Sequence, residues 1–169
     1  MQKLEVYFDY TCPYCLRGHE YLLELQPQFP DLVVEWHPCE AHPRPESYGQ
    51  HSDLCVRGMY VALESGADLM EYHNSMYRAA LKDRADIENL NILLRYSEGI
   101  LDQGKLKLAL SDGLYEDRLL ENNRLAWDEY GFPAVPSYKM GENMLKSKLG
   151  VGVSKKQLAV FIRKQLKST

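Results

Sequence analysis

The chain lacks several features that would assign it to particular classes of protein. Its 169 residues include only four cysteines, too few for a small secreted scaffold held together by disulfides. No apolar stretch is long enough to span a bilayer, and the chain has neither an internal repeat nor a low-complexity segment. With a net charge of -4 and a pI near 5.7, the chain also lacks the basic surface that nucleic-acid-binding proteins use. We therefore expect a globular protein with no nucleic-acid or membrane partner.

An apolar leader is also missing from the N-terminus. The first three residues run directly into a strand-like segment, without a small-residue cleavage site. On this ground we expect a cytoplasmic protein, and in a reducing compartment Cys-x-x-Cys cysteines are more often catalytic than structural. The length suits one domain, or one domain that carries an insertion.

What the chain does contain is a pair of cysteines in the stretch Val6-Tyr-Phe-Asp-Tyr-Thr-Cys-Pro-Tyr-Cys15. The segment Leu4–Phe8 has the composition of a buried strand, and the leucine-rich pattern after Cys15 predicts a helix. Cys12 then stands at the start of this helix, where unpaired N–H groups and the macrodipole favour a negative charge. Pro13 suits the first helical position because it needs no donor there. The pattern predicts a reactive thiolate at Cys12 with a lowered pKa.

A Cys-x-x-Cys pair is also half of a zinc site, so a zinc- or peptide-binding module without enzymatic activity is an alternative. That alternative requires a second ligand pair at comparable spacing. Cys39 and Cys55 are too far apart in the sequence to supply one, and His37 and His42 could join Cys39 only with Pro38 between them. The strand–dithiol–helix context favours redox chemistry, and we expect neither a metal nor an organic cofactor.

The rest of the chain divides into strand-like and helical segments. A second strand is predicted at 32–36, and the prolines in 37–50 cannot continue it. Helical periodicity then dominates, with Asp68 and Asp86 as expected N-caps. The predicted helices span 54–63, 69–81, 87–100, 105–110 and 114–130.

Near the C-terminus the pattern becomes strand-like again. Strands are predicted at 137–140 and 144–149, on either side of a hairpin turn, and Ser154 is expected to cap a last amphipathic helix. The order β-α-β, helices, β-β-α predicts an α/β protein: a thioredoxin fold with an all-helical insertion. The expected division is 1–50 for the first part of this fold, 51–130 for the insertion and 131–169 for the second part.

Three motifs then suggest a family. They are Phe8-Asp-Tyr-Thr-Cys-Pro-Tyr-Cys15, Val34-Glu-Trp-His-Pro38 and Gly131-Phe-Pro-Ala-Val-Pro-Ser137. With this layout the chain resembles the DsbA-like branch of the thioredoxin superfamily, and within it the cytosolic FrnE-type oxidoreductases. The resemblance implies a thiol–disulfide oxidoreductase that exchanges disulfides with protein or peptide thiols, or with glutathione as a co-substrate.

The resemblance also implies roles for residues of the first motif. Cys12 is the attacking thiol and Cys15 the resolving thiol. Pro13 and Tyr14, which stand between them, are expected to contact the substrate. The strongly oxidising DsbA type has a histidine where Tyr14 stands, so we expect a milder potential, about -200 to -230 mV rather than about -120 mV.

From the third motif, Val135 and Pro136 are carried over as substrate-orienting residues. The family implies a cis peptide bond before Pro136, and Pro133 is the competing candidate for this role. A backbone edge beside such a proline can pair with an extended peptide.

Other side chains allow more than one interpretation. Cys39 stands where many FrnE-type chains have an apolar residue. It could pair with Cys55 if their Cα atoms lie within about 7 Å, although two separate thiols are favoured. Arg17 and His19 could help the thiolate, but side chains of these types more often face solvent. Methionines and tyrosines recur at helical spacing in 51–130, where they could line a substrate groove or, more commonly, form core.

A glutathione-dependent isomerase or transferase is a further alternative. The same superfamily branch contains 2-hydroxychromene-2-carboxylate isomerases and kappa-class glutathione transferases, which typically have serine where Cys12 stands. The complete Cys-Pro-Tyr-Cys motif disfavours this alternative. The physiological substrate, the direction of electron flow and the oligomeric state are left open by the sequence.

Overall fold

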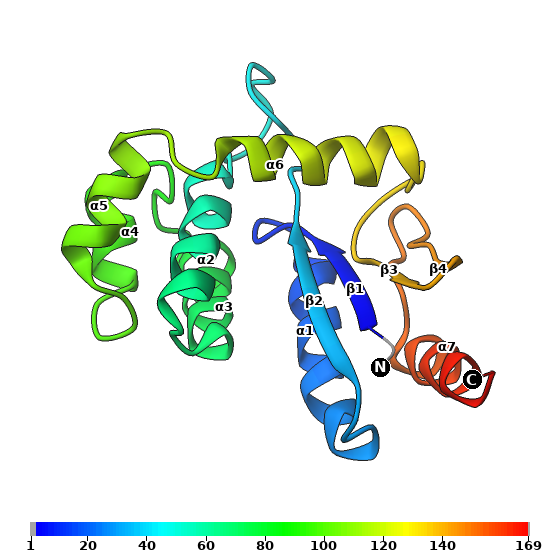
Figure 1. The fold of residues 1–169 in the computed structure, drawn as a ribbon. Helices are drawn as coiled ribbons and strands as arrows, with labels where there is room; N and C mark the ends of the chain where they lie inside the picture. Colours follow the sequence, from blue (N-terminus) through cyan, green and yellow to red (C-terminus); the bar gives the residue numbers. More distant parts are fainter. Residues whose placement is uncertain (1–2, 169) are drawn as a thin grey trace.

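A small mixed sheet lies beside a separate group of helices (Figure 1). The computed structural model describes residues 3–168. The strand order is β2-β1-β3-β4, with β1 parallel to β2 and antiparallel to β3, while β3 and β4 form a hairpin. The strands are β1 Lys3–Phe8, β2 Val33–Pro38, β3 Ser137–Met140 and β4 Asn143–Leu145.

Helices connect and cover these strands. The helix α1 (Pro13–Leu25) joins the two parallel strands, and α7 (Lys155–Lys167) follows β4. The chain between β2 and β3 is helical, as predicted, and its last part, α6 with the π-helical η3, runs from the helical group toward β3 (Figure 1). None of the helices within 3–168 is both long and apolar enough to cross a membrane. The remaining helices are η1 Gln26–Gln28, α2 Asp53–Ser65, α3 Leu69–Tyr77, η2 Arg78–Lys82, α4 Leu90–Tyr96, α5 Gln103–Ser111, α6 Glu116–Asn123 and η3 Arg124–Glu129.

Side-chain caps explain where several helices begin. The Asp68 carboxylate accepts hydrogen bonds from two N–H groups of the first turn of α3, and Ser154 forms a capping box at α7, so both predicted caps are confirmed. The predicted cap at Asp86 is wrong. Asn89 caps α4 instead, and because residues 86–89 form a turn, this helix is shorter than predicted.

The second predicted strand of the hairpin is too long. Strand β4 ends at Leu145, because the Ser147 N–H donates to the Ser137 hydroxyl at 2.9 Å instead of continuing the ladder. The chain then turns back on itself through a bridge between Lys148 and Gly152. The result is a short loop, residues 148–152, that replaces the end of the predicted strand and is exposed except at Gly152.

Aromatic side chains fill the interface between the sheet and the helical group. Phe8 packs edge to face on Tyr10, which packs in turn on Tyr72 and Tyr77 of α3. Most of the methionine and tyrosine side chains in the helical block are therefore part of the core, and do not line a substrate groove. The buried members are Met59, Tyr60, Tyr72, Met76 and Tyr77, whereas Met70 is half-buried.

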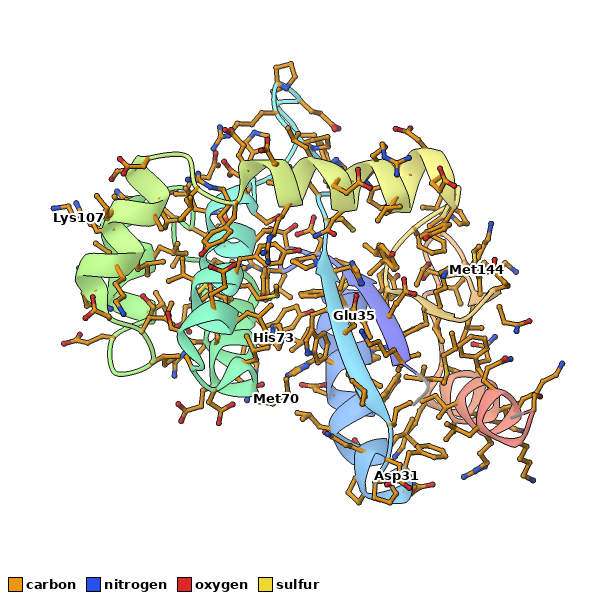
Figure 2. All side chains as sticks on the ribbon, viewed as in Figure 1. Asp31, Glu35, Met70, His73, Lys107 and Met144 are labelled. Atoms are coloured by element: carbon orange, nitrogen blue, oxygen red, sulfur yellow. The ribbon has the colours of Figure 1, made fainter. Side chains whose placement is uncertain are left out.

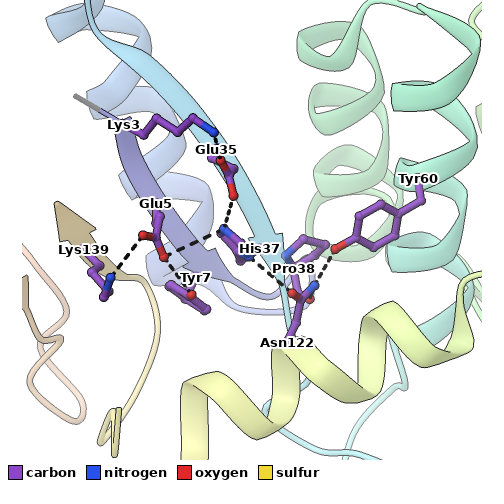
Figure 3. A network of polar contacts seen from close by, with 9 residues as sticks. All are labelled: Lys3, Glu5, Tyr7, Glu35, His37, Pro38, Tyr60, Asn122 and Lys139. Atoms are coloured by element: carbon purple, nitrogen blue, oxygen red, sulfur yellow. Dashed lines mark hydrogen bonds and ion pairs between the residues drawn. The ribbon is translucent and has the colours of Figure 1, made fainter. Parts of the chain in front are cut away.

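A polar network also joins the sheet to the helices (Figure 3). His37 of β2 lies 3.1 Å from a Glu35 carboxylate oxygen through Nε2, and 3.3 Å from the Asn122 side-chain oxygen through Nδ1. The Asn122 amide of α6 donates to the Pro38 carbonyl at 2.9 Å and to the Tyr60 hydroxyl at 2.6 Å. This network fixes α6 over the end of β2, beside which the candidate site lies.

Candidate active site

The dithiol lies just beyond the carboxyl ends of the parallel strands β1 and β2. Cys12 is the N-cap of α1, with the extended conformation φ -97° and ψ 118°, and Pro13 occupies the first turn. The N–H groups of Cys15 and Leu16 donate to the Cys12 carbonyl at 3.1 and 3.2 Å, which are the first hydrogen bonds of the helix. The predicted position of both cysteines is confirmed.

The two thiols differ in exposure and in pKa. Cys12 is half-buried and Cys15 is buried. The Cys15 thiol, which donates toward the Cys12 sulfur, is the largest cause of the lowered pKa of Cys12, and the N–H groups of Cys15 and Tyr14 lower it further. Burial is the main reason why the pKa of Cys15 is raised. Of the two thiols, Cys12 is therefore the one that ionises more readily, and the Cys15 thiol lowers its pKa more than the N–H groups of the helix start do.

The turn before β3 faces the exposed thiol. The peptide bond between Val135 and Pro136 is cis, as the family resemblance implies, whereas Pro133 has no cis bond. The Cys12 thiol donates to the Val135 carbonyl oxygen at 3.5 Å. Strand β3 and this turn thus place the third motif against the dithiol, although more than 120 residues separate Cys12 from Val135 in the chain.

A groove of about 520 Å³ opens beside Cys12. Five segments meet around it: 11–14, 41–43, Trp127, 133–135 and 149–150. Among the described residues that line it, none is Lys, Arg, Asp or Glu. The walls from 41–43 and Trp127 were not foreseen, because only the fold brings the loop after β2 and the π-helix η3 together.

Tyr14 holds the loop 148–152 against the dithiol turn. Its hydroxyl donates to the Gly150 carbonyl at 2.8 Å. Its ring leaves little room at Gly152, where an added Cβ would lie 3.0 Å from the ring. Leu149 of the same loop is 75% exposed and stands at the groove. Tyr14 was expected to contact the substrate, and the structure also shows it as a tether.

Asp9 is a residue of the site that the sequence reasoning missed. Its carboxylate is 1% exposed, and Oδ1 accepts hydrogen bonds from the Thr11 N–H and hydroxyl, both at 2.9 Å. Oδ2 accepts from the Ala41 N–H at 2.8 Å, which joins the dithiol turn to the groove wall. The Asp9 charge opposes the lowering of the Cys12 pKa. A charged residue directly after a buried strand was the available signal.

The remaining side chains singled out from the sequence lie elsewhere. Arg17 is exposed, as expected, whereas His19 is buried and lies 2.9 Å from Asn74 through Nε2, so the expectation that it faces solvent is wrong. Cys39 and Cys55 are free thiols whose pKa values are raised by burial. They are two separate buried thiols in this structure.

Among residues 3–168, no group of three or more His, Cys, Asp and Glu side chains is placed to hold a metal ion. His37 is engaged in the network of Figure 3, and His42 lies 3.0 Å from Glu46.

Comparison with known protein families shows to which family the chain belongs. The model of the DSBA-like thioredoxin domain matches residues 3–154. The chain belongs to the DSBA-like thioredoxin domain family. Members of this family are disulfide oxidoreductases. The predicted α/β fold with its helical insertion is confirmed, and so is the resemblance to the DsbA-like branch.

Individual relatives are distant in sequence and close in fold. The chain has a TM-score of 0.82 to a probable DsbA oxidoreductase from Streptomyces coelicolor, with 14% identity over 100% of this chain and 92% of that one. A putative protein disulfide isomerase from Nitrosomonas europaea gives 0.79, with 14% identity over 99% and 98% of the two chains. An uncharacterized protein of Bacillus subtilis (strain 168), YwbO, is 24% identical over 92% of this chain and 95% of its own length.

Proposed function

We propose that the chain is a thiol–disulfide oxidoreductase in which Cys12 attacks and Cys15 resolves. The observation that carries the proposal is the asymmetry of the pair: the more accessible thiol has the lowered pKa, and the buried thiol beside it has the raised pKa. The position of Cys12 at the helix start adds to this asymmetry, because the N–H groups of Cys15 and Tyr14 also lower its pKa.

The exchange proceeds in two steps. The Cys12 thiolate attacks one sulfur of a substrate disulfide, forms a mixed disulfide and releases the other substrate sulfur as a thiolate, which takes up a proton. Cys15 then loses its proton and attacks the Cys12 sulfur, which releases the second substrate thiolate. The dithiol has become a disulfide and the substrate has gained two electrons. Run in reverse, the same steps oxidise a substrate dithiol.

We further propose that Pro13, Tyr14, Val135 and Pro136 contact the substrate. The first two residues line the turn that carries Cys12, and Val135 presents its carbonyl oxygen 3.5 Å from the Cys12 sulfur. A groove without Lys, Arg, Asp or Glu side chains suits a polypeptide segment better than glutathione, whose charged groups would find no ionic partner there. We therefore place protein or peptide thiols first and glutathione second as partners.

Within the family we propose the FrnE-type subgroup, on the motif Phe8-Asp-Tyr-Thr-Cys-Pro-Tyr-Cys15 and the Val135-Pro136 turn. Cys39, which is buried, fills the apolar position of that pattern as a small hydrophobic side chain. No cofactor is required by the two-step exchange beyond an external thiol or disulfide.

Trapping of the mixed disulfide tests the proposal. A Cys15→Ser variant exposed to a peptide disulfide or to oxidised glutathione should accumulate an adduct at Cys12, visible by mass analysis and reversed by a reductant. Cys55→Ala is the matched control, because it removes a buried thiol away from the groove and should leave no persistent adduct.

Two results would count against the oxidoreductase. One is a folded Cys15→Ser variant without an adduct. The other is a Cys12→Ser variant that still conjugates or isomerises a substrate with glutathione, which would favour the transferase alternative. Stoichiometric zinc in the reduced protein would favour a binding module instead.

A further inference from the structure

The exchange at Cys12 needs a proton donor beside the groove. Each of its two steps releases a substrate sulfur as a thiolate, which has to take up a proton. A substrate that reaches Cys12 through the groove releases this sulfur among walls that, within the described residues, include no Lys, Arg, Asp or Glu. Such surroundings disfavour the charged form of the departing sulfur. A proton donor on the groove wall would therefore help the sulfur to leave.

His42 is the lining residue that can supply this proton. Within the described lining of the groove, the side chains that can ionise are those of Cys12, Tyr14 and His42. Cys12 is the nucleophile itself, and the Tyr14 hydroxyl already donates to the Gly150 carbonyl at 2.8 Å. Histidine is the side chain that most readily gives and takes protons near neutral pH. The composition of the walls thus leaves His42 as the candidate.

One nitrogen of the His42 ring is held by a carboxylate and the other is free. Nδ1 lies 3.0 Å from a Glu46 carboxylate oxygen, which accepts the hydrogen bond, so Nδ1 carries a proton. Among the described residues Nε2 has no hydrogen-bond partner, and the side chain is 38% exposed. A carboxylate on one nitrogen orients a histidine for proton transfer through the other. Arg44, the cation of the same loop, is paired with Asp53 and Glu88.

The loop that carries His42, between β2 and α2 (Figure 1), is fixed to the dithiol turn. The N–H of Ala41, the preceding residue, donates to the Asp9 carboxylate at 2.8 Å. The His42 carbonyl accepts from His51 Nδ1 at 2.9 Å. The His42 ring also packs edge to face on Tyr48, with ring centroids 4.8 Å apart. These contacts keep the imidazole at the groove wall opposite no charged competitor among the described lining residues.

We propose that His42 is the general acid and base of the exchange and that Glu46 orients it; this rests on the exchange proposed for Cys12. As the Cys12 thiolate bonds to one substrate sulfur, the bond between the two substrate sulfurs breaks. Protonated Nε2 gives its proton to the departing sulfur, which leaves as a thiol. The neutral ring regains a proton from solvent, which balances the proton that Cys15 loses, and protonates the second substrate sulfur when Cys15 attacks. In the reverse direction, neutral Nε2 takes the proton of a substrate thiol, and the resulting thiolate attacks the Cys12 sulfur of the disulfide.

Two disulfides whose sulfur leaves in different ways test the proposal. Dithiodipyridine releases its sulfur as a stable thione, which needs no proton on sulfur, whereas an uncharged peptide disulfide releases an alkyl thiolate. In reduced His42→Gln, the rate constant with the peptide disulfide should fall by about 100-fold, the lower end of what a positioned acid contributes. The rate constants for dithiodipyridine and for alkylation of Cys12 should stay the same, because neither reaction needs this proton.

His37→Gln is the matched control. His37 is also paired with a glutamate, Glu35, which Figure 2 labels on β2, but it lies at the junction with α6 and not at the groove. This variant should leave both rate constants unchanged. His42→Arg separates proton transfer from charge, because arginine keeps its positive charge and gives up no proton. It should react with the peptide disulfide as slowly as His42→Gln does.

The outcomes distinguish this proposal from the exchange itself. An unchanged rate with the peptide disulfide in His42→Gln would overturn the role of His42 and leave the exchange intact, as would a normal rate in His42→Arg or an equal fall for both disulfides. No reaction of the unaltered protein with either disulfide would refute the exchange. Heavy water gives a test without a variant: the rate constant with the peptide disulfide, divided by that with dithiodipyridine, should fall, and a constant ratio would overturn proton transfer to sulfur.

Discussion

A methyl group added at Gly18 should disturb the dithiol through packing alone. Gly18 is buried in α1, one turn after Cys15, and a Cβ built there lies 2.6 Å from the Tyr138 hydroxyl oxygen and 3.1 Å from Cγ of Pro136. The first of these falls 0.8 Å short of the 3.4 Å at which ordinary contact begins. Tyr138 is 1% exposed, so its ring cannot swing into solvent.

The cost in stability follows from two opposing effects. Overpacking of a close-packed interior costs about 1–3 kcal/mol, whereas alanine in place of glycine within a helix returns about 1 kcal/mol. We expect Gly18→Ala to lower the free energy of unfolding by about 1 kcal/mol. Denaturant unfolding at pH 7 measures this value, with the m-value unchanged.

The effect on exchange should exceed the effect on stability. The contact between the Cys12 sulfur and the Val135 oxygen is already 3.5 Å long, and we expect displacement of Pro136 to lengthen it. A misplacement of about 1 Å can cost about 100-fold in rate, so we expect kcat/KM for a peptide disulfide to fall about 10-fold.

Gly58→Ala is the matched control. Gly58 is also a buried helical glycine, and its Cβ would collide with the Tyr72 hydroxyl, in the helical block and outside the groove. This variant should lose stability and keep the exchange rate of its folded fraction. Equal exchange rates in the two variants would refute the role assigned to the α1–β3 packing.

Three further changes have predictable outcomes. Asp9→Asn removes a charge that opposes ionisation of Cys12, so the pKa of Cys12 should fall. The pH dependence of alkylation or of thiolate absorbance measures this pKa, and an unchanged value would contradict the role of the charge. Arg57 is a buried guanidinium that donates to the carbonyls of Leu114, Ala109 and Leu110 at 2.8, 3.2 and 2.7 Å. Arg57→Met removes these hydrogen bonds, so the free energy of unfolding measured in a urea titration should fall by about 3 kcal/mol, and by less in Arg57→Lys. Burial holds the pKa values of His19 and His73 below the ordinary 6.5, so below about pH 6.5 the unfolded chain binds more protons than the folded chain. The free energy of unfolding should therefore fall as the pH is lowered from 7 to 5.5, and an increase would contradict the neutral state of these rings.

The sequence could predict those parts of the site that lie close together in the chain. The strand–turn–helix that carries Cys12 and Cys15 is local, and its signals are a buried run, a proline at the first turn and leucine periodicity. The Val135-Pro136 turn is distant, and its place against the dithiol came from family resemblance. Spacing alone would not have chosen it over Pro133.

The parts that could not be predicted depend on packing between distant segments. Trp127 reaches the groove because η3 is a π-helix that follows α6, and its indole N–H donates to the Glu40 carbonyl at 2.9 Å. The end of β4 is set by the bond from Ser147 to the Ser137 hydroxyl. His19 was expected at the surface because its own helix gives no sign that α3 will cover it. The hydrophobic periodicity of the sequence gives no signal of any of these three interactions.

The surroundings of Cys12 also bear on the redox potential expected from Tyr14. A dithiol becomes more oxidising as its reduced thiolate is stabilised, by about 30 mV for about 1.4 kcal/mol, or roughly one unit of pKa. Here the Cys15 thiol and the helix N–H groups stabilise the thiolate, while burial and the Asp9 charge oppose it. Asp9 is fixed by three hydrogen bonds, so its charge cannot turn away from the thiolate. This opposition is a second reason to expect a potential milder than that of DsbA. Asp9→Asn should make the potential less negative by about 30 mV for each unit by which the pKa of Cys12 falls. A titration against glutathione in which the pKa falls and the potential stays constant would show that the thiolate does not set the potential.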